Sequence, residues 1–102
     1  MKHDAVVMVR IYLTEGEHLM KTLLARLHDE EKVQGVTVFR GISGFGRSGK
    51  VHSTSLIDLS LDLPLVIEFF DAPDKVKRIL SHLKDVLPAG HVVSWPAQVN
   101  AG

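Results

Sequence analysis

The residues best suited to chemistry lie in a glycine-rich stretch that runs from Gly41 to His52. It holds four glycines, two cations (Arg47 and Lys50) and a histidine, and it closely follows the apolar run 36–39. A strand that opens into such a loop exposes backbone N–H groups together with positive charge, which suits an anion such as a phosphate. The sequence therefore predicts a phosphate-binding or partner-binding loop. The alternative is a mobile hairpin tip, in which the glycines serve turn geometry and the cations serve solubility.

The spacing of this stretch also bears on nucleotide hydrolysis. Residues 44–50 match G-x-x-x-x-G-K, but a hydrolase loop needs Ser or Thr after the lysine to hold magnesium, and a helix behind it. Val51 follows Lys50, and no helical pattern comes after it. We therefore expect a binding loop rather than a hydrolase loop, in which Gly44 and Gly46 allow a ligand to approach the backbone closely.

Two of the six histidines are better candidates for a site than the others. His52 lies beside the loop and His91 follows Gly90, so both could flank one cleft between subunits. As cations they would help to hold an anion, and as neutral imidazoles they could bind a metal ion. No two histidines have the spacing of metal ligands on a helix, so no metal ligand is assigned, although symmetry copies in an oligomer could still build a metal site. Three others are expected on helix surfaces: His18, His28 and His82.

Catalysis finds no support in the remaining polar residues. Asp58 and Asp62 alternate with leucines, so they are expected on the solvated side of a strand rather than as an acid–base pair. Serines and a threonine surround His52, but no third group can be identified that would orient it as a base. We assign no catalytic residue and expect a protein that is not an enzyme.

The composition is that of a single soluble domain spanning residues 1–102. Hydrophobic residues make up 45% and charged residues 24%, and the formal net charge is zero, which gives no argument for binding nucleic acid or a membrane surface. The chain has no cysteine, which excludes disulfides and thiol chemistry. The first residues do not lead into a signal-peptide core, and no apolar run is long enough to span a bilayer. A cytoplasmic protein is expected.

Apolar periodicity predicts two strand–helix–strand units separated by an elaborated hairpin. The first strand covers residues 5–13, and Thr14 with Glu17 is expected to form a capping box for a helix that runs to about Glu31. Pro64 is expected to interrupt the alternating segment 57–63. Four further elements are predicted: a strand at 36–42, a strand at 65–70, a helix that begins at 71–74 and ends by Pro88 and Gly90, and a strand at 91–95. The tail 99–102 is expected to be loose, as is the loop 43–55.

This order predicts an α+β, ferredoxin-like βαββαβ fold, an antiparallel sheet with two helices on one face. The other face would expose four apolar side chains, a surface too apolar for water: Val6, Met8, Val66 and Phe70. Arg10 and Glu68 lie on that face and are expected to pair across it. We therefore expect oligomerisation through the uncovered face, with a monomer as the alternative.

At this point a resemblance becomes specific. The run Gly44-Phe45-Gly46-Arg47, followed by His52 and Ser53, resembles the start of the T-loop in PII signal-transduction proteins. The wider pattern is similar to a PII-like family of unknown function. It includes residues 10–12, residues 35–38, the run from Arg40 to Gly46, and Leu59-Ser60-x-Asp62-Leu63-Pro64.

The resemblance implies a compact homotrimer that regulates other proteins and does not catalyse a reaction. In PII proteins the base of the T-loop helps to form a nucleotide site between subunits, and the matching positions here are Gly44, Phe45, Gly46 and Arg47. A second loop of the classical site corresponds to residues 87–91, which include Gly90 and His91 but no lysine. Some members occur with membrane transport proteins, fluoride channels among them, so a transporter, channel or metabolic enzyme is the implied partner.

The hypothesis that follows is a trimer that binds a small anionic effector, such as an adenine nucleotide, between subunits. Lys50, His52, Gly90 and His91 would contribute to the site beside the residues of the loop base. One alternative is a metal-responsive trimer resembling the divalent-cation-tolerance proteins, with His52 or His91 as a ligand. Others are a small enzyme with an intersubunit site, and a purely structural trimer.

Overall fold

The computed structural model describes residues 1–15, 18–45, 51–53 and 63–102. The predicted succession of two strand–helix–strand units around a hairpin is confirmed. In chain order the elements are β1 (His3–Thr14), α1 (Met20–Ala25), the π-helical turn η2 (Arg26–Glu30), β2 (Val36–Arg40), β3 (Ser43–Phe45), β4 (Val51–Ser53), β5 (Pro64–Asp71), α2 (Pro73–His82) and β6 (Val92–Asn100).

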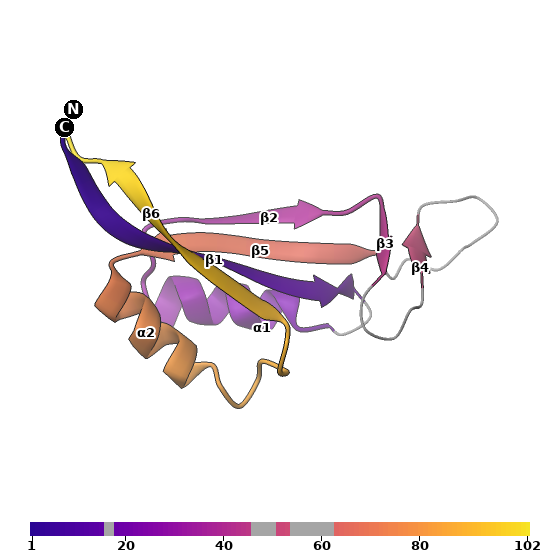
Figure 1. The fold of residues 1–102 in the computed structure, drawn as a ribbon. Coiled ribbons are helices and arrows are strands. Elements are labelled where there is room, and N and C mark those ends of the chain that lie inside the picture. The colour runs from indigo at the N-terminus through magenta and orange to yellow at the C-terminus, as the bar shows by residue number, and fades with distance from the viewer. Residues whose placement is uncertain (16–17, 46–50, 54–62) are drawn as a thin grey trace.

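Four strands form one antiparallel sheet in the order β2-β5-β1-β6, and both helices cover the same face of it (Figure 1). Alternate residues of the two central strands point toward the helices and are buried, as the period of a strand requires. This is the ferredoxin-like α+β fold that the sequence predicted. The core is built from Val9, Ile11, Leu13, Leu65, Ile67 and Phe69 of the sheet with Leu23, Leu27, Val76, Ile79 and Leu83 of the helical layer.

The two helices begin differently from each other. Pro73 occupies the first turn of α2, where its missing N–H is no loss, as predicted. The helix expected directly after Thr14 begins only at Met20, and Thr14 is the last residue of β1, paired with Pro64. Glu17, the other member of the expected capping box, lies outside the described residues. The residue before α1, Leu19, provides no side-chain cap.

Strand ends also differ from the expectation around the hairpin. β2 ends at Arg40 rather than Ile42. The Gly41 N–H still donates to the Pro64 carbonyl at 2.7 Å, but Pro64 has no N–H to return the bond, and the chain turns into β3. Pro64 does not interrupt a strand: it begins β5, where a residue without an N–H is tolerated. Of the alternating segment 57–63 only Leu63 lies within the described residues, and it is buried. Asp58 and Asp62 lie outside them.

The C-terminal segment is longer and better ordered than predicted. β6 continues to Asn100, which pairs with His3, and the Ala101 N–H donates to the Lys2 carbonyl at 2.8 Å. Pro96 lies within this strand, which is possible because β6 is at the edge of the sheet. The expectation of a loose tail at 99–102 is therefore corrected for residues 99–101. The local pattern could not reveal the pairing, because its partner is the other end of the chain.

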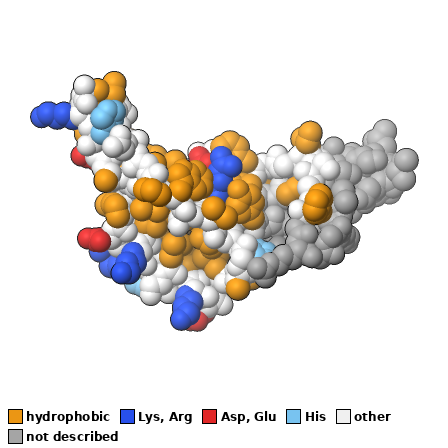
Figure 2. All heavy atoms as spheres, in the orientation of Figure 1, with side chains coloured by type: hydrophobic (Ala, Val, Ile, Leu, Met, Phe, Trp, Pro, Cys, Tyr) orange, Lys and Arg blue, Asp and Glu red, His pale blue; other side chains and the backbone are white. Residues whose placement is uncertain are grey.

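Hydrophobic side chains gather over the sheet in Figure 2. Strand register places four exposed large hydrophobic residues on the face away from the helices: Tyr12, Phe39, Val93 and Trp95. Arg10 Nε donates to Glu68 Oε2 at 2.7 Å, which confirms the predicted pair. Val6 was expected to be exposed there, but it is 4% exposed. It precedes the first β1–β5 pair, in the part of β1 that continues with β6 as a two-stranded ribbon curling away from the sheet (Figure 1).

A buried carboxylate joins the start of α2 to the segment before β2. Asp71 is 3% exposed; its Oδ1 accepts from Gln34 Nε2 at 3.1 Å and from the Ala72 N–H at 2.9 Å. Its Oδ2 lies 2.9 Å from Lys75 Nζ, which also donates to the Lys32 carbonyl at 2.7 Å. Burial raises the pKa of Asp71, but the hydrogen bonds from Lys75, Ala72 and Gln34 outweigh it, so the pKa lies below its ordinary value.

Asp71→Asn is expected to lower the free energy of unfolding by about 2 kcal/mol at neutral pH, because charge-assisted hydrogen bonds are lost. A lowered pKa means that the carboxylate stabilises the fold above its unfolded pKa of about 3.9, and that this contribution disappears as the pH falls through the folded pKa. Urea unfolding at a fixed chain concentration should therefore show the two proteins converging between about pH 5 and pH 2. A gap that is constant over this range would contradict the assignment.

Candidate functional site

The glycine-rich stretch begins where β2 ends, and its described part forms a small hairpin. Residues 43–45 of β3 pair with residues 51–53 of β4, so that Gly44 lies directly across from His52. The predicted loop 43–55 therefore contains a short ordered ribbon. Phe45 is 76% exposed on this ribbon. Gly46, Arg47 and Lys50, which the sequence singled out, lie outside the described residues.

Two glycines let the start of this stretch pass close over the first residue of β5. A Cβ atom added to Gly41 would stand 2.9 Å from Pro64 Cγ, and one added to Gly44 would stand 3.2 Å from the same atom. The pyrrolidine ring is rigid, so it cannot move aside as a flexible side chain would. We call Gly41, Gly44 and Pro64 the glycine crossing. Close packing against Pro64 thus explains Gly44, for which the sequence indicated approach to a ligand.

A pocket of about 280 Å³ opens beside the glycine crossing, at the same end of the sheet. Arg40 lines it, and its Nε lies 2.5 Å from Glu15 Oε1. Lys21 and His18 add two further basic side chains, and His18 has a positive φ of 55°. We call this the basal pocket; its lining residues are Glu15, His18, Met20, Lys21, Arg40 and Leu65. Because basic groups outnumber the single carboxylate, the pocket suits an anion.

Gly90 and His91 lie at the opposite edge of the sheet, just before β6. Gly90 has a φ of 85°, a backbone conformation that favours glycine. Both the backbone and the side chain of His91 contact Tyr12. The Tyr12 N–H donates to the His91 carbonyl at 2.8 Å, and the His91 ring Nδ1 lies 2.8 Å from the Tyr12 carbonyl oxygen. An Nδ1 that donates to the Tyr12 carbonyl carries a proton. In the neutral ring, Nε2 is then a hydrogen-bond acceptor.

Within one chain the structure does not bring the predicted site residues together. Gly44, Phe45 and the backbone of His52 belong to the hairpin that follows β2, whereas Gly90 and His91 precede β6. Gly44 packs against Pro64 at the start of β5, and β1 lies between β5 and β6, so about 10 Å of sheet, two strand spacings, separates the two groups. No single phosphate group can contact both edges of one subunit.

The basal pocket is the part of the site that the sequence analysis did not assign. Arg40 was noted only within the family pattern, and its position directly before Gly41 is the signal that could have indicated its role. His18 was expected on a helix surface; it is exposed but precedes α1. Lys21 carries no local signal, because only the meeting of the ends of β1, β2 and β5 places it near Arg40.

Comparison with known proteins identifies the family. A family model for DUF190, described as Uncharacterized ACR, matches residues 6–99. The chain belongs to the DUF190 family. A UPF0166 protein of Aquifex aeolicus (strain VF5) is 39% identical to it over 70 residues, which cover 69% of this chain. The same match covers 66% of that relative, slightly less than two thirds of its length.

Solved structures similar to this DUF190 chain include those of a PII-like protein. CPII, a nitrogen regulatory PII-like protein from Thiomonas intermedia K12, bound to ADP, AMP and bicarbonate, superposes with a TM-score of 0.70 at 21% identity over 98% of this chain and 92% of CPII. CPII bound to ADP and bicarbonate gives a TM-score of 0.65 at 22% identity over 99% and 92%. The DUF190 chain thus has a PII-like fold, as the resemblance implied.

Two further findings concern the described part of this DUF190 chain. Among those residues, no cluster of three or more His, Cys, Asp or Glu side chains is arranged to hold a metal ion. In the same residues, neither helix is long and apolar enough to cross a bilayer.

Proposed function

We propose that this chain is a PII-like regulatory protein that binds an adenine nucleotide between its subunits and has no catalytic activity of its own. The observation that carries the proposal is the position of the glycine crossing and the basal pocket, side by side at the end of the sheet where the glycine-rich loop begins. CPII, which shares the fold, binds ADP and AMP. The resemblance to PII proteins at residues 44–47 supports the same class of ligand for this chain.

The proposed site is shared between two copies of the chain. Gly44 and Phe45 would contribute from one subunit, and Gly90 and His91 from the next, because a second copy can bring its β6 edge against the β2 edge of the first. Arg47, Lys50 and His52 complete the proposed set. Assembly as a homotrimer through the face away from the helices would create three such clefts. The apolar character of that face supports this assembly.

The chemistry of the described residues suits the two ends of a nucleotide. Arg40 and Lys21 of the basal pocket would attract the phosphates, and Arg40 can offer a planar fork of donors to phosphate oxygens. The exposed ring of Phe45 provides an apolar surface for the base. Binding would favour one arrangement of residues 43–55, which would then engage or release a membrane transporter, channel or metabolic enzyme in the cytoplasm.

Isothermal titration with ADP, AMP and ATP tests this proposal, and we expect about one nucleotide per chain. Gly41→Ala should weaken binding at least about tenfold, because the new methyl group displaces the loop base from Pro64. Gly35→Ala is the matched control, since nothing lies within 4 Å of its added Cβ.

His91→Ala should also weaken nucleotide binding, whereas His28→Ala, which changes an exposed side chain, should not. Uptake of copper or zinc without any nucleotide would favour the metal-responsive alternative instead.

Mixing the two weakened variants distinguishes a shared site from one within a single chain. In oligomers reassembled from equal amounts of Gly41→Ala and His91→Ala chains, about a quarter of the shared sites would have both edges intact. Those sites should recover the affinity of the unmodified protein. Sites contained within one chain would recover none, which would exclude the intersubunit location.

A further inference from the structure

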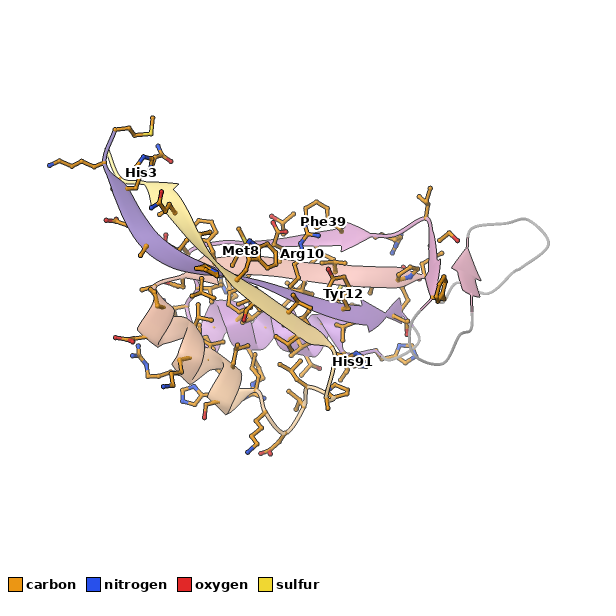
Figure 3. The ribbon with its side chains drawn as sticks, viewed as in Figure 1. His3, Met8, Arg10, Tyr12, Phe39 and His91 are labelled. Atoms are coloured by element: carbon orange, nitrogen blue, oxygen red, sulfur yellow. The ribbon has the colours of Figure 1, made fainter. Side chains whose placement is uncertain are left out.

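The open face of the sheet is organised in three rows that run across the strands. Two rows are apolar, and the charged pair lies in the row between them. Figure 3 shows Met8, Arg10, Tyr12 and Phe39, which represent all three rows. Strand register gives the rows as Phe39-Val66-Tyr12, Thr37-Glu68-Arg10-Val93, and Phe70-Met8-Trp95.

The pair in the middle row is held firmly but is still open to solvent. Arg10 Nε lies 2.7 Å from Glu68 Oε2, with 40% and 22% of the two side chains exposed. The guanidinium carbon also lies 5.8 Å from the centroid of the Trp95 ring. Side-chain hydrogen bonds raise the pKa of Arg10 above its ordinary value, and the bond to Glu68 contributes more than the bond to Tyr12. A guanidinium group is always protonated in proteins, so the charge of Arg10 has to be balanced when the face is covered.

Covering this face with another surface removes water from both charges. An entirely apolar partner would leave the pair desolvated with no new partner, which is unfavourable. A second copy of the chain presents the same neighbouring cation and anion. Rotation of one copy relative to another can then place the cation of one subunit beside the anion of the next. The face is thus complementary in charge to itself.

We propose that Arg10 and Glu68 determine which partner the open face accepts, by pairing with Glu68 and Arg10 of a second copy of this chain. This inference rests on the assembly in the proposed function and adds the residues that make it selective. Burial of the two apolar rows would favour contact with many different apolar surfaces. The middle row sets the register of one sheet on another and disfavours partners without matching charges.

Charge reversal tests the inference by sedimentation velocity on full-length chains. Arg10→Glu and Glu68→Arg should each weaken self-association at least about tenfold, because like charges then meet across every interface. In a mixed trimer of these two variants, opposite charges meet at two of the three interfaces, so the mixture should associate more strongly than either variant alone and less strongly than the unmodified protein. The double variant, with both reversals in one chain, should associate with itself. Lys77→Glu, on the exposed side of α2, is the control and should behave as the unmodified protein.

The outcomes separate this inference from the assembly on which it rests. A wild-type chain that stays monomeric at every concentration would overturn the proposed assembly and the inference together. A wild-type oligomer whose single-reversal variants associate equally well would overturn the inference alone. So would two weakened variants that fail to rescue each other, because the pair would then act only within its own chain. Glu68→Gln, which keeps the shape of the side chain, gives a milder test if circular dichroism shows that a reversal unfolds the chain.

Discussion

Phe69→Ala is expected to lower the free energy of unfolding by about 3–5 kcal/mol, because a large ring is removed from the centre of the core and leaves a cavity. Phe69 is 1% exposed and lies between the sheet and both helices. Domains of this size are stable by only about 5–15 kcal/mol, so a large fraction of the stability of a subunit would be lost. Urea denaturation followed by circular dichroism measures the change.

Phe45→Ala is the matched control for that experiment. It removes the same ring from a side chain that is 76% exposed, so the change in stability should stay within about 0.5 kcal/mol. Equal losses in the two variants would show that Phe69 does not occupy the core position described above.

Phe39→Asp is expected to dissociate the proposed oligomer while leaving the subunit folded. Phe39 lies on the edge strand β2 and is 46% exposed, so its replacement disturbs little within one chain. In an interface the carboxylate would be buried without a partner, which costs about 3 kcal/mol, or about a hundredfold in affinity. Sedimentation velocity over a concentration series measures the shift.

The control places the same charge on the opposite layer of the molecule. Thr22 is exposed on α1, and Thr22→Asp should leave the oligomer unchanged. Association of Phe39→Asp at unmodified strength would mean that the open face is not the contact surface.

Periodicity was enough to predict the fold, because burial on one side of a strand or helix imposes a regular apolar pattern. The alternation of Leu65, Ile67 and Phe69, and the spacing of Val76, Ile79 and Leu83, match the buried positions. The same alternation predicted the Arg10–Glu68 pair, since it placed both side chains on the open face.

The element ends and much of the site depend on contacts between distant segments, which a local pattern does not contain. β2 ends opposite Pro64, which has no N–H to continue the pairing, and the end of β6 is set by pairing with the start of the chain. The basal pocket arises in the same way, because Glu15, Lys21 and Arg40 come from separate elements. The local sequence could therefore indicate a loop with positive charge but not the pocket beneath it.

β2 is restrained near both of its ends. Before it, Gln34 is bound to the buried Asp71, and after it, Gly41 is bound to Pro64. A strand restrained in this way gives the loop that follows it a fixed starting position. Because the same Asp71 also binds the backbone of Ala72 and the side chain of Lys75, a displacement of β2 by the loop would reach the start of α2 through this carboxylate.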